Sequence, residues 1–196
     1  MKLPISYYLG ENVVEIARDL LGKILFTNIN NRITAGIISE TEAYAGETDK
    51  ASHAYGGLIT NRTEVLFRNG GIIYVYLCYG IHHLFNIVTG PINIPHAVLI
   101  RGIIPYEGKN EMRNRIGANN ISSKRTNGPG KLSKALGITT KFNCESLIGN
   151  RIWIEDGEIK INPEEIVTSK RIGVGYAEED AMLPYRFNLI SEYKLS

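Results

Sequence analysis

Residues 72–89 read IIYVYLCYGIHHLFNIVT, and this stretch decides the fold. Its β-branched and aromatic residues favour extended strands, and Gly80 interrupts them near the middle. Gly70 and Gly71 stand just before the stretch and mark its start. The pattern therefore predicts two strands, 72–79 and 82–89, that run antiparallel to each other on either side of Gly80.

The sequence on both sides of this hairpin predicts further paired strands and few helices. Apolar residues at helical spacing predict a helix over 11–21, which Gly22 ends. The other predicted elements, in chain order, are strands over 23–29 and 33–44 joined across Asn30-Asn31, a strand over 96–104 ended by Pro105, a short helix over 131–136 closed by Gly137, a second hairpin of 151–154 and 158–161 around Asp156-Gly157, and a last strand over 185–190.

Hairpins outnumber helices in this pattern, and strands do not alternate regularly with helices. This order argues against a doubly wound parallel sheet. We expect an α+β fold with a curved, open-barrel-like antiparallel sheet, flanking helices and a protruding β-hairpin. The 196 residues, 43% of them hydrophobic, suit a single domain over 1–196 with one sizeable core.

Composition excludes several classes of protein. No apolar run is long enough to span a bilayer, and residues 1–4 lead into polar and aromatic sequence instead of a signal-peptide core. Cys78 and Cys144 lie far apart and neither has a CxxC partner, so a disulfide framework or a cysteine zinc site is not expected. We expect a monomeric, cytoplasmic protein, nucleoid-associated if bacterial, that binds no membrane, metal or cofactor.

Charge is unevenly distributed, although the formal net charge is only +2. The stretch 109–134 is basic around the single acid Glu111, whereas 155–180 is rich in Asp and Glu. A basic face suits phosphate groups. A solvated loop with ordinary lysines is the alternative interpretation of the basic stretch.

The segment SETEAY, residues 39–44, carries two carboxylates within a predicted strand. Side chains alternate along a strand, so Glu40, Glu42 and Tyr44 are expected on one face. Carboxylates on the inward face of an apolar strand cost free energy unless they are paired or used in chemistry. A purely structural or solvated role is the alternative.

An ordered set of motifs over residues 10–190 resembles the alkyladenine (3-methyladenine) DNA glycosylase family. The motifs are Glu42-Ala43-Tyr44, His53, Tyr74-Val75-Tyr76, Tyr79-Gly80, Asn86, Val98-Leu99-Ile100-Arg101, Gly128-Pro129 with Lys131-Leu132, Arg171 to Gly175, and Pro184 to Phe187. No single motif is decisive, but the set is specific in its order and spacing.

The resemblance implies an enzyme that extrudes alkylated or deaminated purines from double-stranded DNA and hydrolyses the N-glycosidic bond without a lyase step. It implies that Glu42 is the general base that activates water, with Arg101 and the main chain at Ile172 holding that water. The implied base pocket consists of Tyr44, His53, Tyr76 and Asn86, and Asn86 is expected to exclude the 2-amino group of guanine. Tyr79 is the implied wedge in the minor groove, and Arg125 and Lys131 are expected to contact the DNA backbone.

Each site residue also has an ordinary structural interpretation. Arg101 could simply pair with Glu40 or Glu42. His53 could cap a helix or lie at the surface, and Asn86 could be a polar residue of an edge strand. For the whole chain, a non-catalytic nucleic-acid-binding module and a protein-interaction or structural domain are the alternatives. The module leaves Glu42 without a purpose, and the second alternative needs neither Glu42 nor Tyr79.

The resemblance also fixes the length of the connection at Gly80, because it requires Tyr76 and Asn86 to face the same pocket. A two-residue connection would put them on opposite faces of the hairpin. We therefore predict an odd-length connection, either three residues over 80–82 or one bulge, with Tyr76 opposite Asn86 and Tyr79 at the tip.

Overall fold

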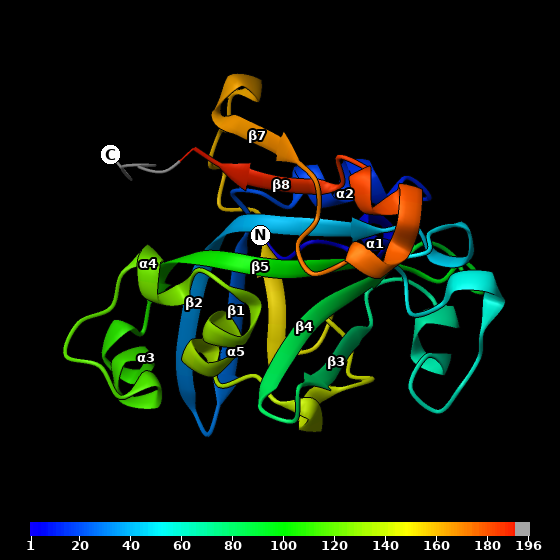
Figure 1. The fold of residues 1–196 in the computed structure, drawn as a ribbon. Coiled ribbons are helices and arrows are strands. Elements are labelled where there is room, and N and C mark those ends of the chain that lie inside the picture. The colour runs from blue at the N-terminus through cyan, green and yellow to red at the C-terminus, as the bar shows by residue number, and fades with distance from the viewer. Residues whose placement is uncertain (191–196) are drawn as a thin grey trace.

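The computed structural model describes residues 1–190, and an antiparallel sheet forms its centre (Figure 1). The strands are β1 (Ile24–Ile29), β2 (Arg32–Tyr44), β3 (Ile73–Cys78), β4 (His82–Thr89), β5 (His96–Glu107), β6 (Ile152–Glu155), β7 (Ile166–Ser169) and β8 (Arg186–Leu189). The main path of the sheet runs β3-β4-β5-β2-β1-β6, while β8 pairs with β2 and β7. The sheet curls into an open half-barrel, which confirms the predicted fold class.

Short helices flank the sheet. They are α1 (Ile5–Tyr8), α2 (Val13–Asp19), α3 (Lys109–Ile116), α4 (Ser123–Thr126), α5 (Pro129–Leu136) and the 3₁₀ helices η1 (Gly46–Thr48), η2 (Tyr55–Gly57), η3 (Glu64–Phe67), η4 (Thr140–Phe142), η5 (Pro163–Glu165) and η6 (Gly175–Met182). The predicted helices at 11–21 and 131–136 correspond to α2 and α5, whose apolar faces join the main core. Among residues 1–190, no helix combines the length and apolar character needed to cross a membrane.

The β1–β2 hairpin forms where the sequence predicted it. Asn30 and Asn31 have φ values of 54° and 58°, and Ile29 pairs directly with Arg32 across them. Asparagine tolerates this left-handed backbone better than most residues, which is why an Asn-Asn pair makes a two-residue turn.

The second predicted hairpin, 151–154 with 158–161, is wrong. β6 pairs with β1 on one side. On its other side the amino terminus takes the edge, because Leu3 N donates to Ile154 O at 2.9 Å and Lys2 bridges to Glu155. No free edge of β6 remains for residues 158–161, and the described segment instead lies outside the strands.

The predicted strand end at Pro105 is also wrong, since β5 continues to Glu107. The register with β2 shifts at this point: Gly36 lies opposite Pro105, but the neighbouring Ala35 lies opposite Glu107. A proline lacks the N–H of a regular ladder and is therefore tolerated at such an irregularity.

The β3–β4 hairpin has the predicted odd-length connection. Cys78 pairs with His82, so three residues, 79–81, form the loop. The expected register is wrong by one pair, because Asn86 lies opposite Tyr74 and not opposite Tyr76. Alternation still places Tyr76 on the same face as Asn86. Tyr79 lies at the tip, 91% exposed.

Close backbone packing anchors the start of this hairpin to α1. Gly70 N donates to Gly90 O, and Gly90 N donates to Tyr8 O, each at 2.8 Å. A Cβ at Gly70 would lie 2.1 Å from Tyr8 O. Residue 70 therefore has to be glycine for β3 to start and β4 to end where they do.

We predict that Gly70→Ala lowers the free energy of unfolding by at least about 2 kcal/mol, since backbone on both sides must move to admit the methyl group. Urea denaturation measures the change. Gly175→Ala is the matched control, because a Cβ there meets nothing within 4 Å. A Gly70→Ala protein as stable as this control would contradict the packing described.

Candidate active site

Two irregularities in the β2–β5 ladder aim charged side chains at one another. Ile38 pairs with Ile103 and Glu40 with Gly102, so Ser39 is an extra residue on β2. Thr41 then pairs with Ile100, which makes Arg101 an extra residue on β5. Such bulges redirect side chains and increase local twist.

The redirected Arg101 bridges the two carboxylates of β2. Its Nε donates to Glu40 Oε1 at 3.0 Å and its Nη1 to Glu42 Oε2 at 3.4 Å. Arg186 of β8 donates from Nε to Glu40 Oε1 at 2.7 Å. Two arginines therefore balance two carboxylates within the sheet, and the structural interpretation of Arg101 as an ion-pair partner holds for both glutamates.

Glu42 is fully buried and accepts hydrogen bonds from three residues. Besides Arg101, Tyr44 Oη donates to its Oε2 at 2.8 Å and Ile172 N donates to its Oε1 at 2.8 Å. Burial nevertheless raises the pKa of Glu42 above its ordinary value, against the opposing effects of Arg101, Ile172 and Tyr44. Burial also raises the pKa of Tyr44, so its phenol stays protonated and remains a donor.

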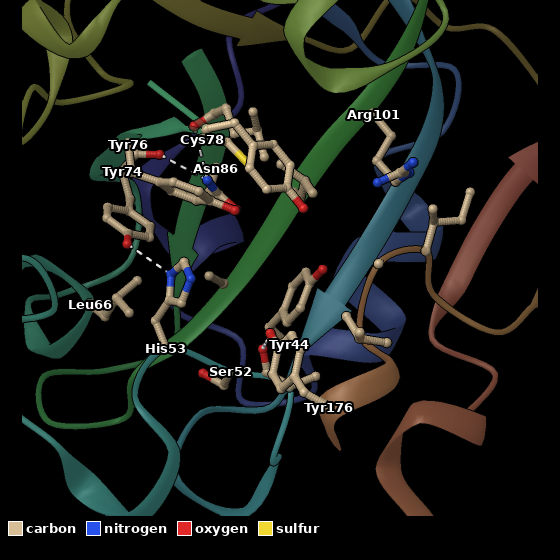
Figure 2. A pocket seen from close by; sticks show the side chains of 18 residues that line it. Tyr44, Ser52, His53, Leu66, Tyr74, Tyr76, Cys78, Asn86, Arg101 and Tyr176 are labelled. Carbon is tan, nitrogen blue, oxygen red and sulfur yellow. Dashed lines mark hydrogen bonds between the residues drawn. The ribbon is translucent and has the colours of Figure 1, made fainter. Parts of the chain in front are cut away.

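A cavity of about 200 Å³ lies directly against this cluster (Figure 2). Tyr44, Arg101 and Ile172, the three donors to Glu42, all line it, whereas Glu42 itself lies behind them. Other lining residues with polar or aromatic side chains are Ser52, His53, Tyr74, Tyr76, Tyr79, Asn86 and Tyr176. Figure 2 shows Tyr74, Tyr76 and His53 on one side of the cavity and Tyr44 and Tyr176 on the other.

Hydrogen bonds fix the tautomer of His53. Arg62 Nη2 lies 3.2 Å from its Nε2, and a guanidinium can only donate, so Nε2 accepts. A neutral ring then carries its proton on Nδ1, which donates to Tyr74 Oη at 2.9 Å. Burial, with a smaller contribution from Arg62, lowers the pKa of His53 to about 4, so the ring is neutral near pH 7.

Asn86 is buried in β4, and its amide nitrogen is fully used by the main chain. Nδ2 donates to Tyr74 O and to Leu84 O, each at 3.1 Å. These bonds fix the orientation of the amide. Its Oδ1 is therefore the polar group that Asn86 can offer to a molecule in the cavity.

Besides Glu42, two of the sequence-predicted residues do not line the cavity. Arg125 is exposed in α4, where its Nε donates to Asn120 Oδ1 at 2.8 Å, and Lys131 is exposed in the first turn of α5. The start of α5 is nevertheless tied to the site, since Gly128 N donates to Arg101 O at 2.8 Å.

Sequence reasoning missed a buried ion pair behind the cavity. Arg171 Nη2 donates to Asp49 Oδ1 at 2.8 Å, Nη1 donates to Asp49 Oδ2 and to Ala43 O, and the guanidinium lies 4.8 Å from the centre of the Tyr44 ring. The pair joins the strand end at Tyr44 to the segment that presents Ile172. The position of Arg171 directly before Ile172 was the only signal in the sequence.

The described residues offer no constellation for a metal. Between residues 1 and 190, no three His, Cys, Asp or Glu side chains gather closely enough to hold an ion. The chemistry that the cavity's own groups support is proton transfer at Glu42 and binding of a planar, aromatic molecule between tyrosines.

Comparisons with known proteins show the family of the chain. Residues 7–192 match the model of a family described as methylpurine-DNA glycosylase. The chain belongs to this family. Membership makes it a DNA repair glycosylase, as the resemblance of its motifs implied.

Relatives of this methylpurine-DNA glycosylase family member cover almost its whole length. A Chlamydia felis protein is 46% identical over 95% of each chain. A Chlamydia abortus protein is 45% identical over 95% of this chain and 97% of its own. A Bacillus cytotoxicus protein is 42% identical over 95% of each chain. All three carry the name "Putative 3-methyladenine DNA glycosylase".

The raised pKa of Glu42 leads to a prediction about the stability of this glycosylase. A carboxyl whose folded-state pKa exceeds its unfolded value stabilises the fold while protonated, and that contribution is lost as the pH rises through the folded pKa. Glu42→Gln imitates the protonated form. We therefore expect its unfolding midpoint to exceed that of the wild type at pH 7 to 8, with the difference vanishing below about pH 4.

Denaturation series at several pH values measure this difference. Glu40→Gln is the matched control and should destabilise, because it leaves Arg101 and Arg186 without the carboxylate oxygen that both contact. A Glu42→Gln protein that is less stable than the wild type at pH 8 would contradict the prediction.

Proposed function

We propose that this glycosylase removes alkylated or deaminated purines from double-stranded DNA, with Glu42 as the general base that activates water. The observation that carries the proposal is the position of Glu42: a buried carboxylate of raised pKa whose three donors all line the cavity. A raised pKa is what a base needs if it is to accept a proton near neutral pH.

The reaction breaks the bond between C1′ of the deoxyribose and the purine nitrogen. The purine leaves with the bonding electron pair, and the sugar develops oxocarbenium character. Glu42 stabilises this positive charge and accepts the proton of the attacking water, whose oxygen bonds to C1′. Arg101 and the main chain at Ile172, which contact Glu42 in the free protein, are expected to hold this water.

The damaged base occupies the cavity after leaving the DNA stack. Its faces lie against Tyr44 on one side and the Tyr76 and His53 wall on the other, and Asn86 faces its edge. Extrusion from a duplex costs a few kcal/mol, and least at damaged pairs, which supplies part of the selectivity. Tyr79, exposed at the tip of the hairpin, takes the place that the base vacates.

Release stops at the abasic site in this mechanism. A lyase step would need an amine to form a Schiff base with the sugar. None of the described residues that line the cavity is a lysine. Strand scission is therefore expected only after alkali treatment.

We predict that Glu42→Gln abolishes the release of hypoxanthine from duplex DNA while leaving its binding to the damaged duplex within about threefold of the wild type, because an amide cannot accept the proton of water. Glu40→Gln should retain measurable release. A duplex with one hypoxanthine, incubated under single-turnover conditions and then treated with alkali, gives the rates.

Three outcomes would contradict the proposed function. Equal losses in both variants would show that Glu42 is not the base. Scission without alkali would show a lyase step. Binding to the damaged duplex without any release by the wild type would favour the nucleic-acid-binding module.

Two exposed cations, Arg125 in α4 and Lys131 in the first turn of α5, lead to a second prediction. Lys131→Gln or Arg125→Gln should weaken binding to damaged and undamaged duplexes alike and lower the slope of log affinity against log salt by about 1. Filter binding at several salt concentrations measures this slope. Arg18→Gln, an exposed arginine of α2, is the control of equal charge. A change in lesion preference alone would instead place the residue in the base pocket.

A further inference from the structure

Arg62 lies against the aromatic wall of the cavity and makes three contacts with it. Its guanidinium carbon lies 4.6 Å from the centre of the Tyr76 ring. Its Nε donates to Tyr74 Oη and its Nη2 donates to His53 Nε2, each at 3.2 Å. The side chain is exposed at its other side.

A network of threonines holds the loop that carries Arg62. Thr60 N donates to Thr63 Oγ1 at 2.8 Å, and Thr63 Oγ1 donates to Leu58 O at 2.7 Å. Arg62 N itself donates to Thr60 Oγ1 at 3.2 Å. These hydrogen bonds within residues 58–63 hold the backbone that carries the guanidinium.

Arg62 lies behind the wall and not inside the cavity. It is absent from the cavity lining, and together with Tyr74, Tyr76 and Asn143 it lines a separate, more open hollow. Both tyrosines line both spaces. A molecule in the cavity would therefore meet Tyr76 with a guanidinium on the ring's outer side.

Carboxylates balance the other arginines around the cavity, but not this one. Arg171, which stacks on Tyr44, pairs with Asp49, and Arg101 shares Glu40 and Glu42 with Arg186. Among residues 1–190 no ion pair joins Arg62 to an acid. Its contacts, a tyrosine hydroxyl, a neutral histidine and a ring face, leave its positive charge uncompensated.

We propose that Arg62 makes the pocket favour uncharged damaged purines, such as hypoxanthine, over cationic N-methylpurines. The inference rests on the proposed function, because it needs the base to lie against the inner face of Tyr76. It assigns a role in specificity to Arg62, an exposed residue that none of the sequence motifs includes.

Two physical effects act in the same direction. The face of a tyrosine ring attracts a cation through its electron density, and a guanidinium on one face draws that density away from the other. The uncompensated charge also repels a second cation across the ring, because the protein between them screens charges less than water does. A neutral base experiences neither penalty and stacks normally on Tyr76.

The test compares 3-methyladenine, which is cationic in DNA, with hypoxanthine, which is neutral; neither carries the 2-amino group of guanine. Single-turnover release from an alkylated duplex and from a hypoxanthine duplex gives a rate ratio for each protein. The ratio of each variant is divided by that of the wild type, which cancels the different intrinsic labilities of the two bonds and any shared effect on DNA binding.

Arg62→Met should raise the ratio of 3-methyladenine to hypoxanthine release by about fivefold, after allowance for solvent screening. Arg62→Lys keeps the charge and should leave the ratio within roughly twofold of the wild type. Arg68→Met removes an equally exposed arginine of the same segment and should leave the ratio unchanged. Arg62→Gln provides a second neutral variant, and thermal denaturation shows which of the two neutral variants is folded.

An unchanged or lowered ratio in a folded, neutral Arg62 variant overturns the inference. If the wild type releases both bases, an unchanged or lowered ratio in the variant leaves the proposed function intact. A wild type that releases neither base overturns the proposed function, and the inference with it. A raised ratio in Arg62→Met together with an equal rise in Arg62→Lys also overturns the inference, because the effect would then not follow the charge.

Discussion

The bridge of Arg101 to Glu40 and Glu42 is the constraint on which the rest of the site depends. Charges can be buried in a sheet only when they are paired and hydrogen-bonded, and removing one partner from such a group costs about 3–5 kcal/mol. Here the pairing depends on the two bulges at Ser39 and Arg101. The β2–β5 ladder is irregular at these residues, and this irregularity brings the charges together. Folding therefore sets the position of the Glu42 carboxylate and of the cavity wall in front of it together.

The walls of the cavity serve folding and chemistry together. Tyr44, Arg101 and Ile172 hold Glu42 in place and also line the cavity. Burial opposes the charge of Glu42 while these donors favour it, and burial has the larger effect on its pKa. The buried carboxylate therefore lowers the stability of the fold. The main core, which includes residues of α2, β5 and α5, has to compensate for this loss.

The local sequence predicted those parts of the fold that short segments determine. Contacts between residues far apart in the sequence determined the other parts. Asn30-Asn31 specifies a turn by its own backbone preference. The odd length of the β3–β4 connection, in contrast, was expected from the family resemblance and not from the local sequence. Asp156-Gly157 carries an equally good turn signal, yet no hairpin forms there, because the amino terminus, distant in sequence, takes the edge of β6.

The same distinction applies to the site. Motif order indicated several of the residues that line the cavity, from Tyr44 to Ile172, but not Ser52 or Tyr176. It indicated them because the order reflects the family's arrangement of strands. It could not indicate the bulge at Arg101, which depends on how two strands pair, nor the contact of Arg171 with Asp49 across the fold.

The exposure of Tyr79 has a consequence for the evolution of the hairpin tip. A side chain that is 91% exposed contributes little to folding, so selection at this position can act almost entirely on what the tip meets outside the protein. Such a residue can change without compensating changes in the core, so the molecule that the tip meets is what constrains it.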